Sequence, residues 1–313
     1  MTKSTKVAKK KDLFQQVQAP SGLGNDPAVS LKPCLLCGGT SVRRLYMQEH
    51  FPVVKCRKCS LVFADEHFRQ ADLESFYSGD YYQGAYVCHP PQIDAKVAAD
   101  YVQAFQRVAK SGTRGRVLDF GSARGTFLGE LKRRKLATDW TLEGIDINAD
   151  EVAMGVEAGN PVRCGSVDEY EPPSETYDAV TAFSVLEHLQ DPLGVLKNLS
   201  RVLKPGGSLV AIVPSGSCLI LDLALAASRL VGRRARTFCD SVFHEEHLYY
   251  FTKATMTETL RRAGLEPKEW FYTPSYLEIH PPNVLIALPA YGLRLASFLS
   301  RKQTMLGVVA RKA

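Results

Sequence analysis

Hydrophobic and polar positions follow two alternating periods through the middle of the chain, and the alternation predicts strands followed by helices. Short apolar runs predict five strands, near residues 116–120, 141–146, 161–164, 177–183 and 207–213. The segments between them predict helices, near residues 126–135, 150–159 and 192–203. This order is typical of an α/β fold with a doubly wound, mostly parallel sheet. In such a sheet, ligands bind beyond the carboxyl ends of the strands.

Further elements are expected on both sides of this region. Before this region, a helix is predicted over residues 92–110. After it, the sequence predicts a helix capped by Thr252 and then a closing strand over 304–311. The chain is therefore predicted to divide into four parts: a basic tail (1–29), a cysteine-bearing module (30–65), a linker with a helix (66–112) and an α/β domain (113–313).

Two insertions in the α/β domain, at residues 214–250 and 276–303, are expected to act as lids and to decide the substrate. The first holds an apolar helix at 219–231, which is followed by three arginines: Arg233, Arg234 and Arg236. The other insertion is predicted to be helical and amphipathic over 281–301. Apolar helices beside arginines would suit a lipid-linked or phosphate-bearing substrate near a membrane surface. The alternative is that they cap the core or form a contact in a homodimer.

The net charge of +6 on the 313 residues comes mostly from the first eleven, which hold five lysines and no acid. The rest of the chain carries only +1, and the lysine-rich start is expected to be disordered. It lacks the apolar core of a signal peptide, and the longest apolar run, 218–231, is too short to span a bilayer. We therefore expect a cytoplasmic protein, with contact at the inner membrane face if the insertions bind lipid.

Four of the eight cysteines form two C-x-x-C pairs, which are Cys34 with Cys37 and Cys56 with Cys59. Each pair can turn two sulfurs toward one ion, and two pairs complete a tetrahedral thiolate site suited to structural Zn²⁺. Short strands are expected near 41–46, 53–54 and 61–63, with metal binding supplying most of the stability. A redox-active dithiol is the alternative. The remaining cysteines are predicted to be small packing residues: Cys88, Cys164, Cys218 and Cys239.

A glycine-rich loop follows the first predicted strand of the α/β domain, in the sequence VLDFGSARGTF. Its glycines allow a tight turn close to a ligand, and the next helix offers unpaired N–H groups. Asp119 precedes the loop and could accept a proton from a ligand ammonium group, while Asp146 ends the second strand, where a ribose would lie. Because nicotinamide-dependent enzymes use a similar loop and carboxylate, these two features alone leave the cofactor open.

Four motifs in order, VLDFGSARGTF, GIDIN, YDAVTAFSVLEHLQDP and RVLKPGGSLVAIVPS, resemble the class I S-adenosylmethionine-dependent methyltransferases. The resemblance covers about residues 115–311 and implies a seven-stranded Rossmann-like sheet. It implies that S-adenosylmethionine contacts the following residues: Asp119 (amino group), Gly121, Ser122, Ala123, Gly125, Asp146 (ribose), Ile147 and Ser166 (adenine), Val167 and Phe183. The family usually has glycine where Ala123 stands, and alanine is tolerable there if the backbone keeps a conformation open to L-residues. It usually has Asp where Ser166 stands.

The N-terminal module adds a narrower resemblance through CLLCG, VVKCRKCSLVF and FYSGDYY. This combination is similar to bacterial methyltransferases that carry a four-cysteine zinc ribbon and act on sugars, lipids and natural products. Sugar C-methyltransferases of this kind have a large additional C-terminal domain, for which this chain has no room.

The candidate catalytic residues are Glu187 and His188, at the end of the fourth strand, and His244 and His247, in a loop before the Thr252 helix. A histidine could act as general base toward a hydroxyl or an acidic carbon, because its pKa lies near neutrality. Each could instead be a structural polar residue. His244 and His247 could also form a metal pair, but the sequence offers no evident third ligand.

The sequence thus predicts methyl transfer from S-adenosylmethionine to a small molecule, to a hydroxyl (or carbon) of a sugar, lipid-linked or natural-product acceptor. One alternative is an RNA methyltransferase that uses the ribbon to bind RNA, which the basic tail and the KRRK run at 132–135 favour. Against it, the rest of the chain is nearly neutral and lacks an Asn-Pro-Pro-Tyr motif, and no DNA partner is expected. The other alternative is a non-catalytic cofactor-binding protein.

Overall fold

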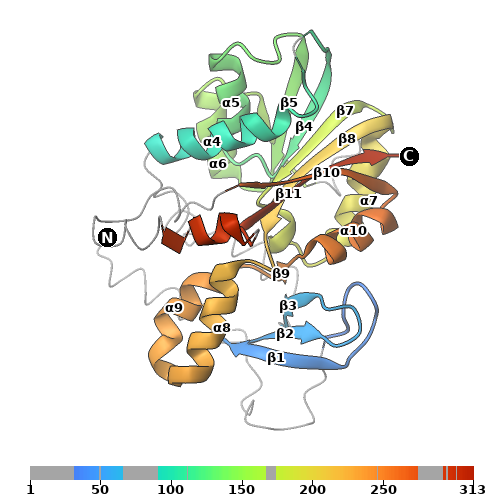
Figure 1. The fold of residues 1–313 in the computed structure, drawn as a ribbon. Helices are drawn as coiled ribbons and strands as arrows, with labels where there is room; N and C mark the ends of the chain where they lie inside the picture. The colour runs from blue at the N-terminus through green and yellow to red at the C-terminus, as the bar shows by residue number, and fades with distance from the viewer. Residues whose placement is uncertain are drawn as a thin grey trace.

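Two β-sheets, one large and one small, organise the chain (Figure 1). The structure is a computed structural model that describes residues 32–48, 51–65, 91–110, 112–166, 174–244, 246–273, 292–293, 295–300 and 302–313. Several sequence predictions fall outside these residues, namely the basic tail, the linker up to residue 90, Cys88, Val167 and much of the second insertion.

The large sheet has seven strands in the order β10-β11-β8-β7-β4-β5-β6. All neighbours from β8 to β6 run parallel, whereas β11 runs antiparallel to both β8 and β10. This confirms the predicted α/β fold with a mostly parallel sheet. The strands are β4 (Gly115–Phe120), β5 (Trp140–Asp146), β6 (Val162–Cys164), β7 (Tyr177–Phe183), β8 (Leu203–Pro214), β10 (Leu265–Thr273) and β11 (Met305–Lys312).

The strand β8 begins earlier than the sequence predicts. Tyr177 of β7 pairs with Leu203, and the register shifts before Ala179 pairs with Ser208. In the same stretch, the Lys204 ammonium donates to both carboxylate oxygens of Asp178, at 2.8 and 2.9 Å. These contacts extend the strand toward its N-terminal end.

Helices cover both faces of the large sheet (Figure 1). On one face, Phe105, Phe127 and Val152 pack with Val117 of β4 in one buried cluster. Leu118, the next residue along β4, belongs to the cluster on the other face, because successive strand side chains point to opposite sides. The helices are α4 (Pro91–Phe105), α5 (Thr126–Arg133) and α6 (Ala149–Glu157) on the first face, and α7 (Pro192–Val202) and α10 (Lys253–Arg262) on the second.

The order of the strands reverses next to β4. After β4 the chain adds β5 and then β6 on one side, and it returns to place β7 on the other side. A reversal of this kind opens a crevice beyond the carboxyl ends of the two strands that flank it. The loops after β4 and β7 are therefore the expected place for a ligand.

The small sheet joins the N-terminal module to a segment far along the chain. Its order is β1-β2-β3-β9, and β9 pairs with β3 through Val62 with Tyr250 and Phe63 with Tyr249. The sequence predicted the first three strands but not the fourth. They are β1 (Val42–Met47), β2 (Pro52–Cys56), β3 (Val62–Ala64) and β9 (Tyr249–Tyr250).

The two sheets also share a hydrophobic core. Leu36, Leu61 and Phe63 of the small sheet's module belong to the same buried cluster as Leu199 and Leu260 of the large domain. Burial of apolar surface therefore adds to the stability of the module. The prediction that metal binding supplies most of the module's stability did not include these apolar contacts with the large domain.

The first insertion forms α8 (Leu219–Val231), a 3-10 turn η2 (Gly232–Ala235) and α9 (Arg236–Val242). Cys218 and Cys239 are buried in this insertion, as predicted for packing residues. Cys164 is exposed at the end of β6, so the prediction that it packs in the interior is wrong. Among the described helices, none is long and apolar enough to cross a membrane.

Candidate active site

The loop between β4 and α5 turns sharply through residues with positive φ. Gly121 and Gly125 have φ of 73° and 71°, and a Cβ on Gly121 would lie 2.3 Å from Val185 Cγ2. Ala123 also lies in the left-handed region, with φ of 45°. This region is open to L-residues but strained, so the alanine side chain costs about 1 kcal/mol there.

Asp146 closes this loop from the neighbouring strand. Its two carboxylate oxygens accept the backbone N–H groups of Ala123, at 2.7 Å, and Asn148, at 2.8 Å. Each oxygen keeps a further lone pair for a ligand. Burial raises the pKa of Asp146 above its usual value, which indicates a carboxylate with little water around it.

Asp119 lies deeper, at the end of β4, and is only 4% exposed. Thr181 Oγ1 donates to its Oδ1 at 2.6 Å. Burial raises the pKa of Asp119 to about 7, and the charge of Asp146 adds to the rise. A buried carboxylate of this kind favours a cationic ligand, because a positive charge would offset the cost of its desolvation.

The other residues predicted to bind the cofactor differ in burial and in the side chains that they contact. The Ser122 hydroxyl is buried without a hydrogen-bond partner, and it lies where a Cβ on Gly144 would come within 2.7 Å. Ile147 is 48% exposed just after β5, and Ser166 is half-buried. Phe183 packs against Tyr101 of α4, with ring centroids 4.4 Å apart.

Glu187 and His188 form a short 3-10 turn directly after β7, as their position in the sequence suggested. Glu187 is 1% exposed, its Oε2 has no hydrogen-bond partner in the described part of the chain, and burial raises its pKa to about 8. His188 Nδ1 lies 2.9 Å from the Glu246 carbonyl oxygen, which can only accept. His188 Nδ1 therefore carries the proton, and the lone pair is on Nε2, 3.9 Å from Glu187 Oε1.

His247 meets this pair from the loop before β9. Its ring centroid lies 5.0 Å from that of His188, and its buried Nδ1 has no hydrogen-bond partner among the described residues. The ligand-type atoms of Glu187, His188 and His247 all lie within 4.8 Å of one another. His244 is exposed, with its ring 5.0 Å from that of His247. From the sequence, His244 and His247 were considered together as a possible metal pair. Nothing in the sequence indicated that His247 lies close to Glu187.

Burial also lowers the pKa values of both inner histidines. The shift at His188 is caused first by burial, and the pKa of His247 falls well below its usual value because burial acts together with the neighbouring His188 and His244. Both rings are therefore neutral at pH 7. A neutral imidazole can accept a proton, which is the state that a general base requires.

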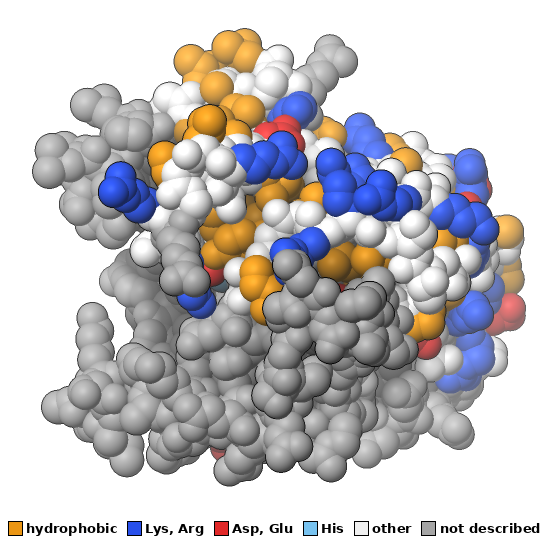
Figure 2. Space-filling model, turned by 90° about the horizontal axis from the view of Figure 1, so that it is seen from below, with side chains coloured by type: hydrophobic (Ala, Val, Ile, Leu, Met, Phe, Trp, Pro, Cys, Tyr) orange, Lys and Arg blue, Asp and Glu red, His pale blue; other side chains and the backbone are white. Residues whose placement is uncertain are grey.

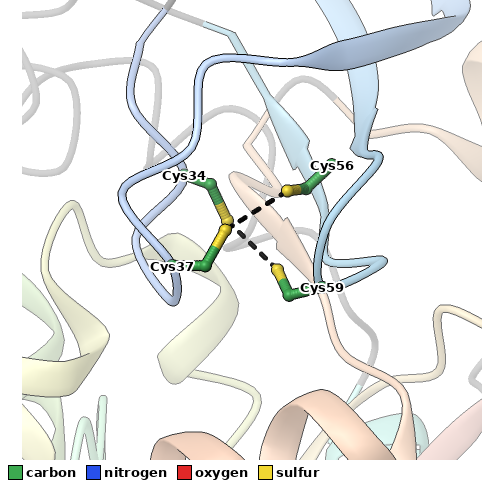
Figure 3. Close-up of side chains that lie close together, drawn as sticks. All are labelled: Cys34, Cys37, Cys56 and Cys59. Carbon is green, nitrogen blue, oxygen red and sulfur yellow. Dashed lines mark hydrogen bonds between the residues drawn. The ribbon is translucent and has the colours of Figure 1, made fainter.

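The two cysteine pairs converge at the edge of the small sheet, with their sulfurs turned toward one another (Figure 3). The Cys34 and Cys59 sulfurs are 3.3 Å apart and those of Cys37 and Cys56 are 3.4 Å apart. All four sulfurs lie within 4.8 Å of one another. A tetrahedral Zn²⁺ with bonds of about 2.3 Å places thiolates about 3.8 Å apart, so the cluster fits such an ion after a small expansion.

Comparison with known proteins identifies the family. The methyltransferase domain family matches residues 93–269, which is more than half of the chain. The chain belongs to this methyltransferase family. The match spans the glycine loop, both aspartates and the Glu187–His188 turn. The protein is therefore a methyltransferase that uses S-adenosylmethionine and acts on a small molecule.

Similar proteins include two ubiquinone biosynthesis O-methyltransferases. That of Xylella fastidiosa (strain M23) is 29% identical over 180 residues, which are 54% of this methyltransferase and 69% of the relative. That of Xanthomonas campestris pv. campestris (strain B100) is 33% identical over 145 residues, covering 44% and 57%. A solved Burkholderia thailandensis 1,6-didemethyltoxoflavin-N1-methyltransferase has 16% identity and a TM-score of 0.50, covering 87% of this chain and 99% of its own. The similarity to this solved structure supports the methyltransferase fold.

The N-terminal module holds the loop that carries His247 in this methyltransferase. Gln48 Nε2 donates to the Phe243 carbonyl at 2.8 Å, and Tyr46 stacks on the Phe243 ring with centroids 5.3 Å apart. The Tyr46 hydroxyl donates to Asp240 Oδ1 at 2.6 Å. These residues were not among the sequence predictions. The aromatic run LYYF after His247 was the available signal, because it is a typical strand pattern.

Proposed function

We propose that this methyltransferase transfers the methyl group of S-adenosylmethionine to a hydroxyl group of a sugar, lipid-linked or natural-product acceptor. The observation that carries the proposal is the meeting of His188, Glu187 and His247 beyond the end of β7, beside the glycine loop. A hydroxyl is a weak nucleophile and needs a base, whereas a more acidic acceptor would not. The O-methyltransferase names of the two relatives support oxygen as the acceptor atom.

The residues of the glycine loop fit the cofactor. Asp119, buried and with a raised pKa, would hold the amino group, whose positive charge offsets the desolvation of the carboxylate. Asp146 would accept the ribose hydroxyls with the lone pairs that Ala123 and Asn148 leave. The exposed Ile147 side chain would pack on the adenine ring. The Gly165 N–H donates to the Asp146 carbonyl at 2.9 Å, so the neighbouring Ser166 would contact the same ring.

The bound cofactor supplies an electrophilic methyl group on a sulfonium, and the chain's part is alignment, exclusion of water and proton removal. We assign the base to His188. The Glu246 carbonyl fixes its tautomer, so Nε2 can take the acceptor proton as the new O–C bond forms. Burial keeps the ring neutral until then. The fixed ring orientation is what a positioned base requires.

The neighbours of His188 have supporting roles in this scheme. Glu187 Oε1 lies 3.9 Å from His188 Nε2, and because burial raises the pKa of Glu187 to about 8, a positive charge on the His188 ring would favour the ionised form of Glu187 beside it. The unpartnered Nδ1 of His247 would bind the acceptor hydroxyl or a hydroxyl beside it. The exposed His244 would contact the outer part of the acceptor.

We also propose that Zn²⁺ occupies the four-cysteine cluster as a structural ion. The four thiols complete the coordination shell of the ion, which leaves no position for catalysis. The ion would hold the turns on either side of β1 and β2, and through Tyr46 and Gln48 it would support the loop that bears His247. Zinc therefore has a structural role that reaches the active site through the β3–β9 pairing.

The proposal is tested with purified protein, S-adenosylmethionine and a panel of acceptors, by measuring S-adenosylhomocysteine release. The panel pairs each hydroxylated compound (nucleotide sugars, polyprenyl-phosphate sugars and phenols) with its deoxy analogue. Turnover that requires the hydroxyl is expected. Equal turnover of a deoxy analogue, with methyl found on carbon or nitrogen, would show that the acceptor atom is wrong.

A further inference from the structure

Several exposed apolar side chains belong to α8 and to the helical segment at 295–299. On α8, Leu223 and Leu230 are exposed at helical spacing, and Leu230 is 84% exposed. Phe298 and Leu299 of the second segment are 64% and 72% exposed. Large apolar side chains scattered singly are normal on a protein surface, but a group on neighbouring elements indicates a binding surface.

Two contacts bring these elements together. The Lys302 ammonium donates to Asp222 Oδ2 of α8 at 2.7 Å, and the Leu219 N–H donates to the Lys302 carbonyl at 2.9 Å. Figure 1 places the helical segment, drawn in deep red, on the side of the molecule that carries α8 and α9. We call the surface made by α8, η2, α9 and residues 295–300 the insertion face.

Positive charge accompanies the apolar side chains of the insertion face. Asp222 is neutralised by Lys302, and Asp240 by Arg236 at 3.5 Å. Arg229 and Arg234 are exposed, and no carboxylate in the described part of the chain forms a salt bridge with either. The face is therefore basic as well as apolar. Figure 2 views the molecule from below, the side that carries α8, α9 and the small sheet, and its coloured part shows hydrophobic and basic side chains interspersed, with fewer acidic ones.

We infer that the insertion face docks on an anionic lipid bilayer. Apolar side chains can enter the interface between head groups and acyl chains, while arginines at the same level pair with anionic head groups. A second copy of the chain fits less well, because an isologous contact would bring the same unpaired arginines together. The chain's own first eleven residues, with five lysines and no acid, carry the same sign of charge.

The inference goes beyond the proposed function and does not depend on the acceptor. It has a consequence for the active site, because α9 leads directly into the loop that carries His244 and His247. Docking would hold that loop near the lipid surface. A lipid-linked or amphiphilic acceptor could then reach the site without leaving the bilayer.

The experiment is co-sedimentation of the full chain with vesicles of phosphatidylcholine alone or mixed with phosphatidylglycerol. Binding is expected only to the mixed vesicles. It should fall when ionic strength rises from about 0.1 M to about 1 M, because the screening length shortens from about 10 to about 3 Å. Equal binding to both vesicles, or none to either, would overturn the inference.

Two double variants locate the contact. Arg229→Glu with Arg234→Glu should weaken binding at least about 25-fold, since each basic residue near an anionic surface contributes about fivefold. Leu230→Ser with Phe298→Ser should also weaken it. The matched controls are Lys268→Glu and Val156→Ser, which alter an exposed cation and an exposed apolar residue elsewhere.

S-adenosylhomocysteine affinity, measured by calorimetry, shows that each variant is folded. Unchanged vesicle binding in both folded double variants would overturn the inference. So would a protein that dimerises through these residues in light scattering and ignores vesicles. A failure of vesicle binding leaves methyl transfer to soluble acceptors intact, so it is distinguishable from failure of the proposed function.

Discussion

If Asp119 holds the amino group of the cofactor, as proposed, its buried carboxyl should make cofactor binding depend on pH. Its pKa lies at about 7 because burial disfavours the charged form and Asp146 repels it, while Thr181 provides one hydrogen bond. In the proposed arrangement, the cofactor's ammonium group pairs with the ionised carboxylate of Asp119. Affinity should therefore be full above pH 7 and should fall as pH drops below the pKa of the free protein.

The magnitude follows from the fraction of Asp119 that is ionised. At pH 5, two units below a pKa of about 7, about 1% of the carboxyl is charged, so affinity falls by up to about 100-fold. Asp119→Asn removes the charge at every pH. A hydrogen bond to a charged group contributes about 1.5–3 kcal/mol, so this variant should bind roughly 10- to 100-fold more weakly at pH 7.5.

The assay is calorimetric titration with S-adenosylhomocysteine between pH 5 and pH 7.5. Asp119→Asn should lose most of the pH dependence, with a residual part from Asp146, whose pKa is also raised. The control is Asp139→Asn, at an exposed carboxylate after α5, which should keep the native profile. Native affinity that stays constant over this range would refute the assignment of Asp119 to the ammonium group.

Four further predictions concern other parts of the molecule. Elemental analysis should find about one zinc per chain; a folded protein without metal, or with a second ion, would contradict the assigned sites. His188→Ala should lower turnover about 100-fold or more and spare cofactor affinity; wild-type turnover would make His188 structural. Ala123→Gly should raise the free energy of unfolding by up to about 1 kcal/mol, because φ is 45° there, and a loss in chemical denaturation would argue against that strain. Tyr46→Phe should lower it by about 1 kcal/mol or more, through the lost bond to Asp240; no change would mean that this bond contributes little.

Sequence patterns predicted the parts of the fold that local residues determine. The strand β7 and the helix α8 have the predicted bounds, because each is a largely apolar segment that ends next to a polar residue or a glycine. The glycine loop with Asp119 and Asp146 also follows from local motifs. Each element carries its own signal in the sequence, and the alternating order then determines the fold class.

Long-range contacts and backbone strain left no comparable signal. Tyr250 pairs with Val62 across most of the chain, and it is this pairing that brings His247 to His188. A two-residue strand has too little sequence pattern to predict its partner. The left-handed backbone at Ala123 was hidden for a similar reason, since alanine gives no indication of positive φ.

Methyl transfer to a small molecule is tested most directly by following the methyl group itself. The protein is incubated with S-adenosylmethionine labelled in its methyl group and with fractionated extracts of polar metabolites, lipids and lipid-linked sugars, RNA and protein. We predict label in the polar or the lipid fraction, and about 100-fold less label there with His188→Ala. Label in RNA would contradict this assignment and identify a nucleic-acid methyltransferase. Small-molecule labelling that persists unchanged in a protein unable to bind the cofactor would also contradict the assignment.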